Sequence, residues 1–162
     1  MRKKLFLAIV ARLTEAVPEI KFIDLWNEQL AVIKTGSAWP LPAVFIEFEQ
    51  YDVHQQANHV RTAVISVRLH IITRAVNYNG SKDERMAQAL AIFDDIDKIN
   101  AAMQGLAGEG FASFMLTASA TNHNHEEIIE SIERWTTRVT DASAARKRTG
   151  VQLTDAEIID RV

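Results

Sequence analysis

Residues 60–73 read VRTAVISVRLHIIT, and they form the clearest alternation of apolar and polar side chains in the chain. The apolar positions are Ala63, Ile65, Val67, Leu69 and Ile71. The polar positions are Thr62, Ser66, Arg68 and His70. A period of two is typical of a β-strand with one buried face. The stretch therefore predicts a half-buried strand that forms the spine of a sheet, with His70 on its less buried face.

The segment before this strand predicts a helix followed by a hairpin. Apolar residues recur at helical spacing over residues 2–16, which indicates an amphipathic helix. Residues 20–26 and 29–34 are rich in β-branched and aromatic residues and are separated by a short polar pair, so we expect two short strands there.

The prolines at positions 40 and 42 fix where the next strand begins. Proline has no backbone N–H to donate to a sheet, so the strand is expected to begin at about residue 43. Val44 and Ile46 would then share one face, opposite Phe45 and Glu47. Residues 51–59 are polar and are expected to form a turn before the central strand.

A second helix is predicted after the central strand. Ser81 and Glu84 match a capping box, so we expect a helix from there to about residue 104. Its apolar stripe would consist of Met86, Leu90, Phe93, Ile96, Ile99 and Met103.

Two more strands are predicted near the C-terminal end. Residues 111–120 read as a strand after two glycines. Residues 127–140 are ambiguous, because Ile128, Ile132, Trp135 and Val139 fit helical spacing. The β-forming residues around Trp135 also fit a period of two, which favours a strand.

This order of elements predicts an α+β fold. We expect a mostly antiparallel sheet with two main helices packed on one face, in the order α-β-β-β-β-α-β-β plus a C-terminal tail. Residues 1–141 would form a single domain, and residues 142–162 a linker with a short amphipathic helix.

Composition limits the classes of function. The chain has 162 residues, which suits one domain, and no cysteine, which excludes thiolate metal sites and a cysteine nucleophile. With a net charge of −3, no specific binding to nucleic-acid phosphates is expected. No apolar stretch approaches the length of a membrane span.

The sequence offers weak signals for chemistry. His123, His125 and Glu127 would share one face of a strand and could hold a metal, but the neighbouring Asn122 and Asn124 favour a polar loop between two strands, and a zinc site needs more ligands. Asp94 and Asp97 share a helix face where solvated charge is normal. No phosphate-binding loop, zinc-protease or nucleophile motif is present. We therefore expect no enzyme activity, no cofactor and no metal.

Trp39 is the most informative aromatic residue. It lies in a loop directly before two prolines, which stiffen the backbone. A large aromatic side chain on a stiff loop is suited to an interface, and it could equally fold over a sheet edge as a lid.

The whole pattern resembles the tail terminator family of long-tailed bacteriophages, also called tail completion or minor tail proteins. The resemblance covers residues 1–141. It rests on the order of elements, on the strand entry PLPAVFIEF at 40–48, and on the polar loop before a final aromatic strand in 111–141. It implies a similar α+β domain, in which 127–140 is a strand.

The resemblance also implies a function by assembly. The protein would form a homo-oligomeric ring, typically a hexamer, that caps the tail tube and contacts the tube protein and the head–tail connector proteins. It would be located in the virion tail after assembly in the cytoplasm of the bacterial host. Trp39, Ile158 and Ile159 are expected at the subunit interface. The alternatives are another head–tail joining or adaptor protein, and a metal-dependent enzyme that uses His123, His125 and Glu127.

Overall fold

Two long antiparallel strands form the spine of the fold. The computed structural model describes residues 1–27, 39–77, 79–122 and 127–145. The helices are α1 (Arg2–Ala16) and α2 (Met86–Met103), and a short 3-10 turn spans Ala57–His59. The strands are β1 (Phe22–Leu25), β2 (Ala43–Phe48), β3 (Val53–Gln55), β4 (Arg61–Arg74), β5 (Met115–Asn122) and β6 (Ile128–Asp141). The α+β prediction is confirmed.

The strands form one mixed sheet in the order β1-β2-β4-β6-β5, and β3 also pairs with β4. The spine is the antiparallel pair β4 and β6, whose register runs from Arg61 opposite Asp141 to Arg74 opposite Ile128. β1 and β2 pair in parallel, whereas all other pairs are antiparallel. The strand predicted at 60–73 is therefore confirmed as the centre of the sheet, and 127–140 is confirmed as a strand.

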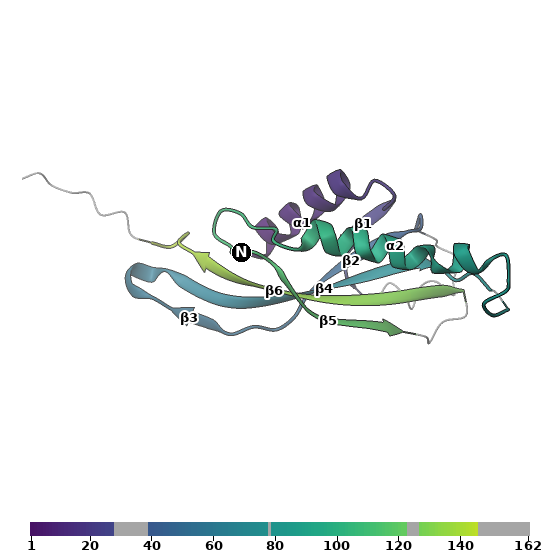
Figure 1. Ribbon diagram of the computed structural model, residues 1–162. Helices are drawn as coiled ribbons and strands as arrows, with labels where there is room; N and C mark the ends of the chain where they lie inside the picture. Colours follow the sequence, from purple (N-terminus) through teal and green to yellow (C-terminus); the bar gives the residue numbers. More distant parts are fainter. Residues whose placement is uncertain (28–38, 78, 123–126, 146–162) are drawn as a thin grey trace, which may run out of the picture.

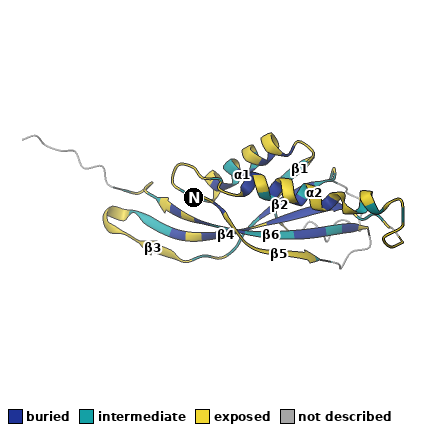
Figure 2. Ribbon diagram, viewed as in Figure 1, coloured by how far each residue is buried: buried dark blue, intermediate teal, exposed yellow. Residues whose placement is uncertain are grey.

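Both helices cover the same face of the sheet (Figure 1). The apolar set predicted on the central strand, such as Ile65 and Leu69, points into the layer between sheet and helices and is fully buried there. Trp135 of β6 is buried in the same cluster. Figure 2 shows that the outer sides of the helices are largely exposed, while the middle of the long strands is buried. The main core is thus a single layer between the helices and one sheet face.

A smaller apolar cluster lies on the opposite face, which we call the open face. Phe45 of β2 and Ile72 of β4 are buried in it. The half-buried side chains that pack against it are Phe22, Trp26, Trp39 and Leu41. This cluster covers one end of the open face and leaves the rest of that face to polar residues.

The predicted start of the second helix is wrong. α2 begins at Met86, and no side chain caps it. The carboxylate of Asp83 accepts the backbone N–H groups of Asn79 and Arg85, at 2.7 and 2.8 Å. These bonds hold a turn where the capping box of Ser81 and Glu84 was expected.

The predicted stripe of α2 is partly wrong. Ile96, Ile99 and Met103 are buried as expected, but Leu90 and Phe93 are 40% and 54% exposed. Ile92 is buried instead, because it lies in line with Ile96 and Ile99 on the side that meets the sheet.

Two strand predictions also need correction. β3 lies within the stretch predicted as a turn, where it forms a hairpin with β4. β5 begins at Met115 rather than 111, since hydrogen bonds between Phe114 and the residues after α2 hold the preceding segment in an irregular path. β1 is confirmed, but its predicted hairpin partner at 29–34 lies outside the described residues.

Candidate contact surfaces

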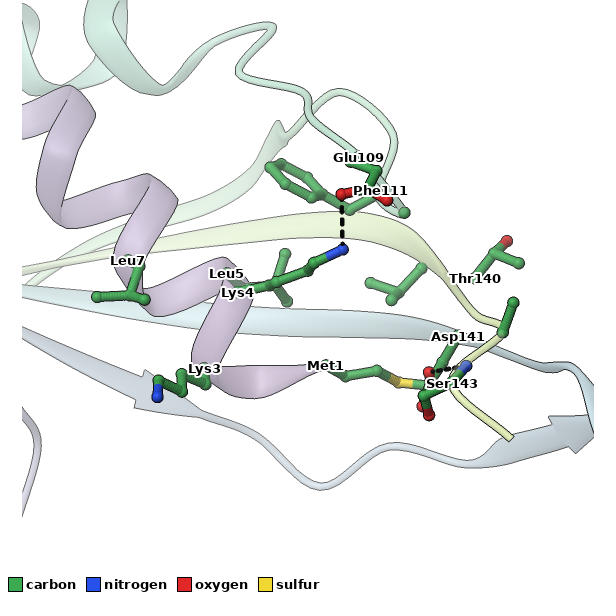
Figure 3. Close-up of a pocket in the computed structure, with 13 residues that line it drawn as sticks. Met1, Lys3, Lys4, Leu5, Leu7, Glu109, Phe111, Thr140, Asp141 and Ser143 are labelled. Atoms are coloured by element: carbon green, nitrogen blue, oxygen red, sulfur yellow. Dashed lines mark hydrogen bonds and ion pairs between the residues drawn. The ribbon is translucent and has the colours of Figure 1, made fainter. Parts of the chain in front are cut away.

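An open groove of about 730 Å³ lies where α1 begins and β6 ends (Figure 3). Leu5 and Leu7 of α1 line one wall, and Thr140 and Asp141 of β6 line another. Phe111 contributes from the connection before β5. Because α1 and β6 are far apart in sequence, only the packing of α1 on the sheet creates this groove.

Ion pairs hold the rim of the groove. Lys4 bonds Glu109 at 3.0 Å, and Arg61 bonds Asp141 at 2.6 Å. The hydroxyl and backbone N–H of Ser143, together with the Arg61 guanidinium, lower the pKa of Asp141 to about 2. Asp141 is therefore ionised at neutral pH and fixes the end of β6.

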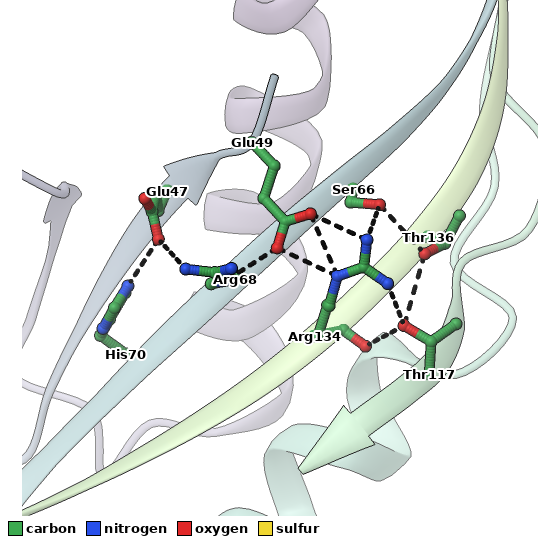
Figure 4. Close-up of polar contacts among 8 residues, drawn as sticks. All are labelled: Glu47, Glu49, Ser66, Arg68, His70, Thr117, Arg134 and Thr136. Carbon is green, nitrogen blue, oxygen red and sulfur yellow. Dashed lines mark hydrogen bonds and ion pairs between the residues drawn. The ribbon is translucent and has the colours of Figure 1, made fainter. Parts of the chain in front are cut away.

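A charged network crosses the open face of the sheet (Figure 4). We define it as Glu47, Glu49, Arg68, His70, Glu130 and Arg134. Arg134 donates to Glu49 through Nε and Nη2, at 2.8 Å for the shortest contact. Arg68 donates to Glu49 at 2.7 Å and reaches Glu47 at 3.5 Å. Positive and negative groups thus alternate across β2, β4 and β6.

Glu49 is the centre of this network. The hydrogen bond from Arg134 and the nearby charge of Arg68 keep the pKa of Glu49 below its usual value. Arg134 also donates to the hydroxyl of Ser66 at 2.9 Å and lies 3.4 Å from that of Thr117. The guanidinium therefore ties the residue that follows β2 to strands β4, β5 and β6.

His70 is buried at the other end of the network, contrary to the prediction that it lies on a less buried face. Only 4% of the residue is exposed. Its Nδ1 lies 2.7 Å from Glu130 and its Nε2 lies 3.1 Å from Glu47. The ring stacks on Trp26 with the centroids 3.8 Å apart. Each ring nitrogen therefore lies within hydrogen-bond distance of a carboxylate, one from β6 and one from β2.

The side chains of the network bind one another across the strands. Both arginines contact carboxylates within the sheet, and both ring nitrogens of His70 lie against carboxylates as well. Sequence reasoning assigned no role to Glu130 and Arg134. The sequence did hold a signal for them. In a strand over 127–140, the period of two places Glu130 and Arg134 on the same face, opposite to that of Trp135.

Strand β5 forms one edge of the sheet. Its residues MLTASATN carry no charge and no proline, and all except Asn122 are exposed. Met115 is 58% and Leu116 is 38% exposed. Among the described strands, β5 pairs only with β6, so its outer backbone groups face away from the described sheet.

The residues predicted for a function are distributed as follows. Trp39 is half-buried, and its ring meets Phe45 edge-on at 5.0 Å, so it covers the open-face cluster. Its role in a subunit interface stays a prediction. Ile158, Ile159, His123 and His125 lie outside the described residues. Glu127 is exposed, and within the described ranges no three His, Asp or Glu side chains lie close enough to hold a metal ion.

Comparison with known proteins adds no assignment. No protein-family model matches the chain, and no curated protein matches it at a significant level. Neither described helix combines the length and apolar character needed to cross a membrane.

Proposed function

We propose that this protein is a structural component of a phage virion, similar in role to tail terminators. Copies of the chain form a ring that caps the tail tube and joins it to the head, and the protein acts by contact without turning over a substrate. Its partners are other copies of itself, the tail tube protein and the head–tail connector proteins. Assembly takes place in the host cytoplasm, and the finished protein resides in the virion tail.

The single observation that supports a contact function is the edge of the sheet at β5. Exposed edge strands are normally protected by charged side chains or prolines, because their unpaired N–H and C=O groups can bind another strand. β5 has neither, although it has a bulge between Leu116 and Ala118. An edge without charged side chains or proline and with exposed Met115 favours a partner that adds a strand or covers the edge.

The phenotype of particles that lack the protein tests the terminator role. We expect electron microscopy to show overlong tails that lack heads, because the ring would no longer stop the tube or join it to the head. Tails of normal length that are attached to heads would contradict the proposal. Tails of normal length without heads would indicate another joining protein instead.

A variant of the edge tests the observation itself. Ala118→Lys with Ala120→Lys places two charges on β5, both at exposed positions. We expect the variant to fold normally but to lose incorporation into tails, because charges on an edge strand oppose strand addition. Ala57→Lys with Ser81→Lys adds the same charge at exposed sites elsewhere and should leave incorporation unchanged. Equal incorporation of both variants would exclude the β5 edge as a contact.

A further inference from the structure

An exposed stripe on α2 combines apolar and acidic side chains. Leu90, Phe93, Asp94 and Asp97 have the spacing i, i+3, i+4, i+7, which places them on one face of the helix. All four are exposed, and Phe93 is 54% exposed. An aromatic ring beside an aliphatic side chain and two carboxylates gives this face both an apolar anchor and negative charge. We call these four residues the α2 stripe.

The contacts of α2 with α1 show where this stripe points. Arg12 of α1 donates to the backbone carbonyl of Ala102, and Lys98 bonds Glu19, which follows α1. At about 100° per residue, Phe93 lies on the side of the helix opposite Ala102. The α2 stripe therefore faces away from α1.

The groove at the start of α1 has the complementary character. Its walls include the exposed Leu7 and the half-buried Phe111, which suit an apolar side chain. Both acids on its rim are already paired, since Glu109 bonds Lys4 and Asp141 bonds Arg61. Lys3 also lines the groove and makes no ion pair within the described part of the chain. The groove thus offers an apolar hollow and an available positive charge.

The two surfaces lie at different ends of the helical layer. α2 rises about 15 Å between Phe93 and Met103. The chain then continues through the connection that holds Glu109 at the groove. The stripe of one molecule cannot bend back into its own groove, because α2 is one continuous helix packed on the sheet. Two different patches on one subunit, complementary in charge, are what a head-to-tail contact between copies requires.

We propose that the α2 stripe of one copy docks into the groove of the next, with Phe93 entering between Leu7 and Phe111 and Asp97 beside Lys3. This inference rests on the proposed self-assembly and names the surfaces that carry it. It leaves the β5 edge available for a different partner.

Charge reversal tests the pairing. Lys3→Glu and Asp97→Lys should each weaken self-association about fivefold at low salt, because each places like charges together. The chain that carries both substitutions should return to within about twofold of the original affinity. Glu15→Lys and Lys21→Glu reverse exposed charges outside both surfaces and serve as matched controls. Sedimentation equilibrium measures all of these association constants.

Truncation of the aromatic anchor tests the apolar part of the contact. Phe93→Ala should weaken association about thirtyfold, as expected for an anchor at the centre of an interface. The melting temperature of the Phe93→Ala variant should stay within about 2 °C of that of the original chain, since Phe93 is not part of the core. A large fall in melting temperature would instead place Phe93 in the fold and overturn the proposal.

The outcomes separate this inference from the proposed function. If the original chain associates but neither the charge reversals nor Phe93→Ala changes its affinity, the named surfaces are wrong and self-assembly stands. If the original chain remains monomeric at every concentration, the proposed self-assembly fails together with the inference. A photoreactive side chain in place of Phe93 gives a direct check, because its cross-link should fall on residues 1–7, 109–111 or 139–143 of a second copy. A cross-link anywhere else would overturn the assignment.

Discussion

The two faces of the sheet use the same strands in opposite ways. On the face beneath the helices, Ile65, Leu69 and Trp135 are buried in the main apolar cluster, and the few polar side chains there, such as Glu133 opposite Leu69, are buried with them. On the open face, neighbouring positions of the same strands carry Arg68 and Arg134, which bind carboxylates across β2, β4 and β6. One face is held by removal of apolar surface from water, the other by directional bonds between charges.

The difference shows that burial alone does not define what a residue contributes. His70 is as deeply buried as many core residues, yet it lies on the charged face between two carboxylates. The helix-covered face contributes to the stability of the fold through the apolar area that it buries. The open face contributes through charged groups that must stay paired. The two faces should therefore respond differently to substitution and to pH.

The sharpest test of this comparison uses adjacent residues of β4. Ile65 is fully buried beneath the helices, and Val64 is 53% exposed on the open face. Ile65→Ala should lower the free energy of unfolding by about 3 kcal/mol, because it leaves a cavity in the main core. Val64→Ala should change it by about 0.5 kcal/mol or less. Urea denaturation measures the loss of stability in each variant. Equal losses would contradict the difference in burial between the two faces.

A double-mutant cycle on the buried pair gives the next largest effect. His70→Leu should lower the free energy of unfolding by about 3 kcal/mol, because the buried Glu130 carboxyl group would lose its 2.7 Å contact with His70. Adding Glu130→Leu should recover much of that loss, since an apolar pair needs no compensation. If the loss in the double variant equals the sum of the losses in the two single variants, the contact between His70 and Glu130 contributes nothing to stability.

The smallest effect is the pH dependence of the open face. The pKa of Glu49 is below its usual value, chiefly because Arg134 donates to it, so its contribution is complete above about pH 4.5 and is lost as the pH falls through the lowered pKa. Stability should therefore decrease in acid, and the decrease should be smaller in the Glu49→Gln variant. Urea midpoints between about pH 6 and about pH 3 check this. An unchanged slope in the variant would show that Glu49 is not responsible for the acid sensitivity.

Sequence reasoning predicted the elements better than the contacts between them. The alternation over 60–73 identified the central strand and its buried side chains, because a period of two is a local property of the backbone. The stripe of α2 was predicted less well. Its sequence carries two overlapping apolar stripes about 100° apart, one through Ile92 and one through Phe93. The periodicity of the helix alone cannot select between them.

The candidate surfaces were the least predictable part. Trp39 was recognised as informative, yet its contact with Phe45 depends on how the loop lies over the sheet. The groove joins Leu7 with Asp141, and the network joins Glu49 with Arg134. Such contacts cannot be predicted from the local sequence, because each partner fits the pattern of its own strand or helix.

The sequence by itself determined the class of fold, the helix at 2–16, and the strand at 60–73 with its apolar face, since local spacing dictates which side chains can share a face. Over 127–140 the local spacing fitted both a helix and a strand, and it only favoured the strand. Only the tertiary structure decided the parallel pairing of β1 with β2, the burial of His70 and the exposure of Phe93. These depend on which element packs against which, and that choice is made by the summed burial and charge pairing of the whole sheet rather than by any one segment.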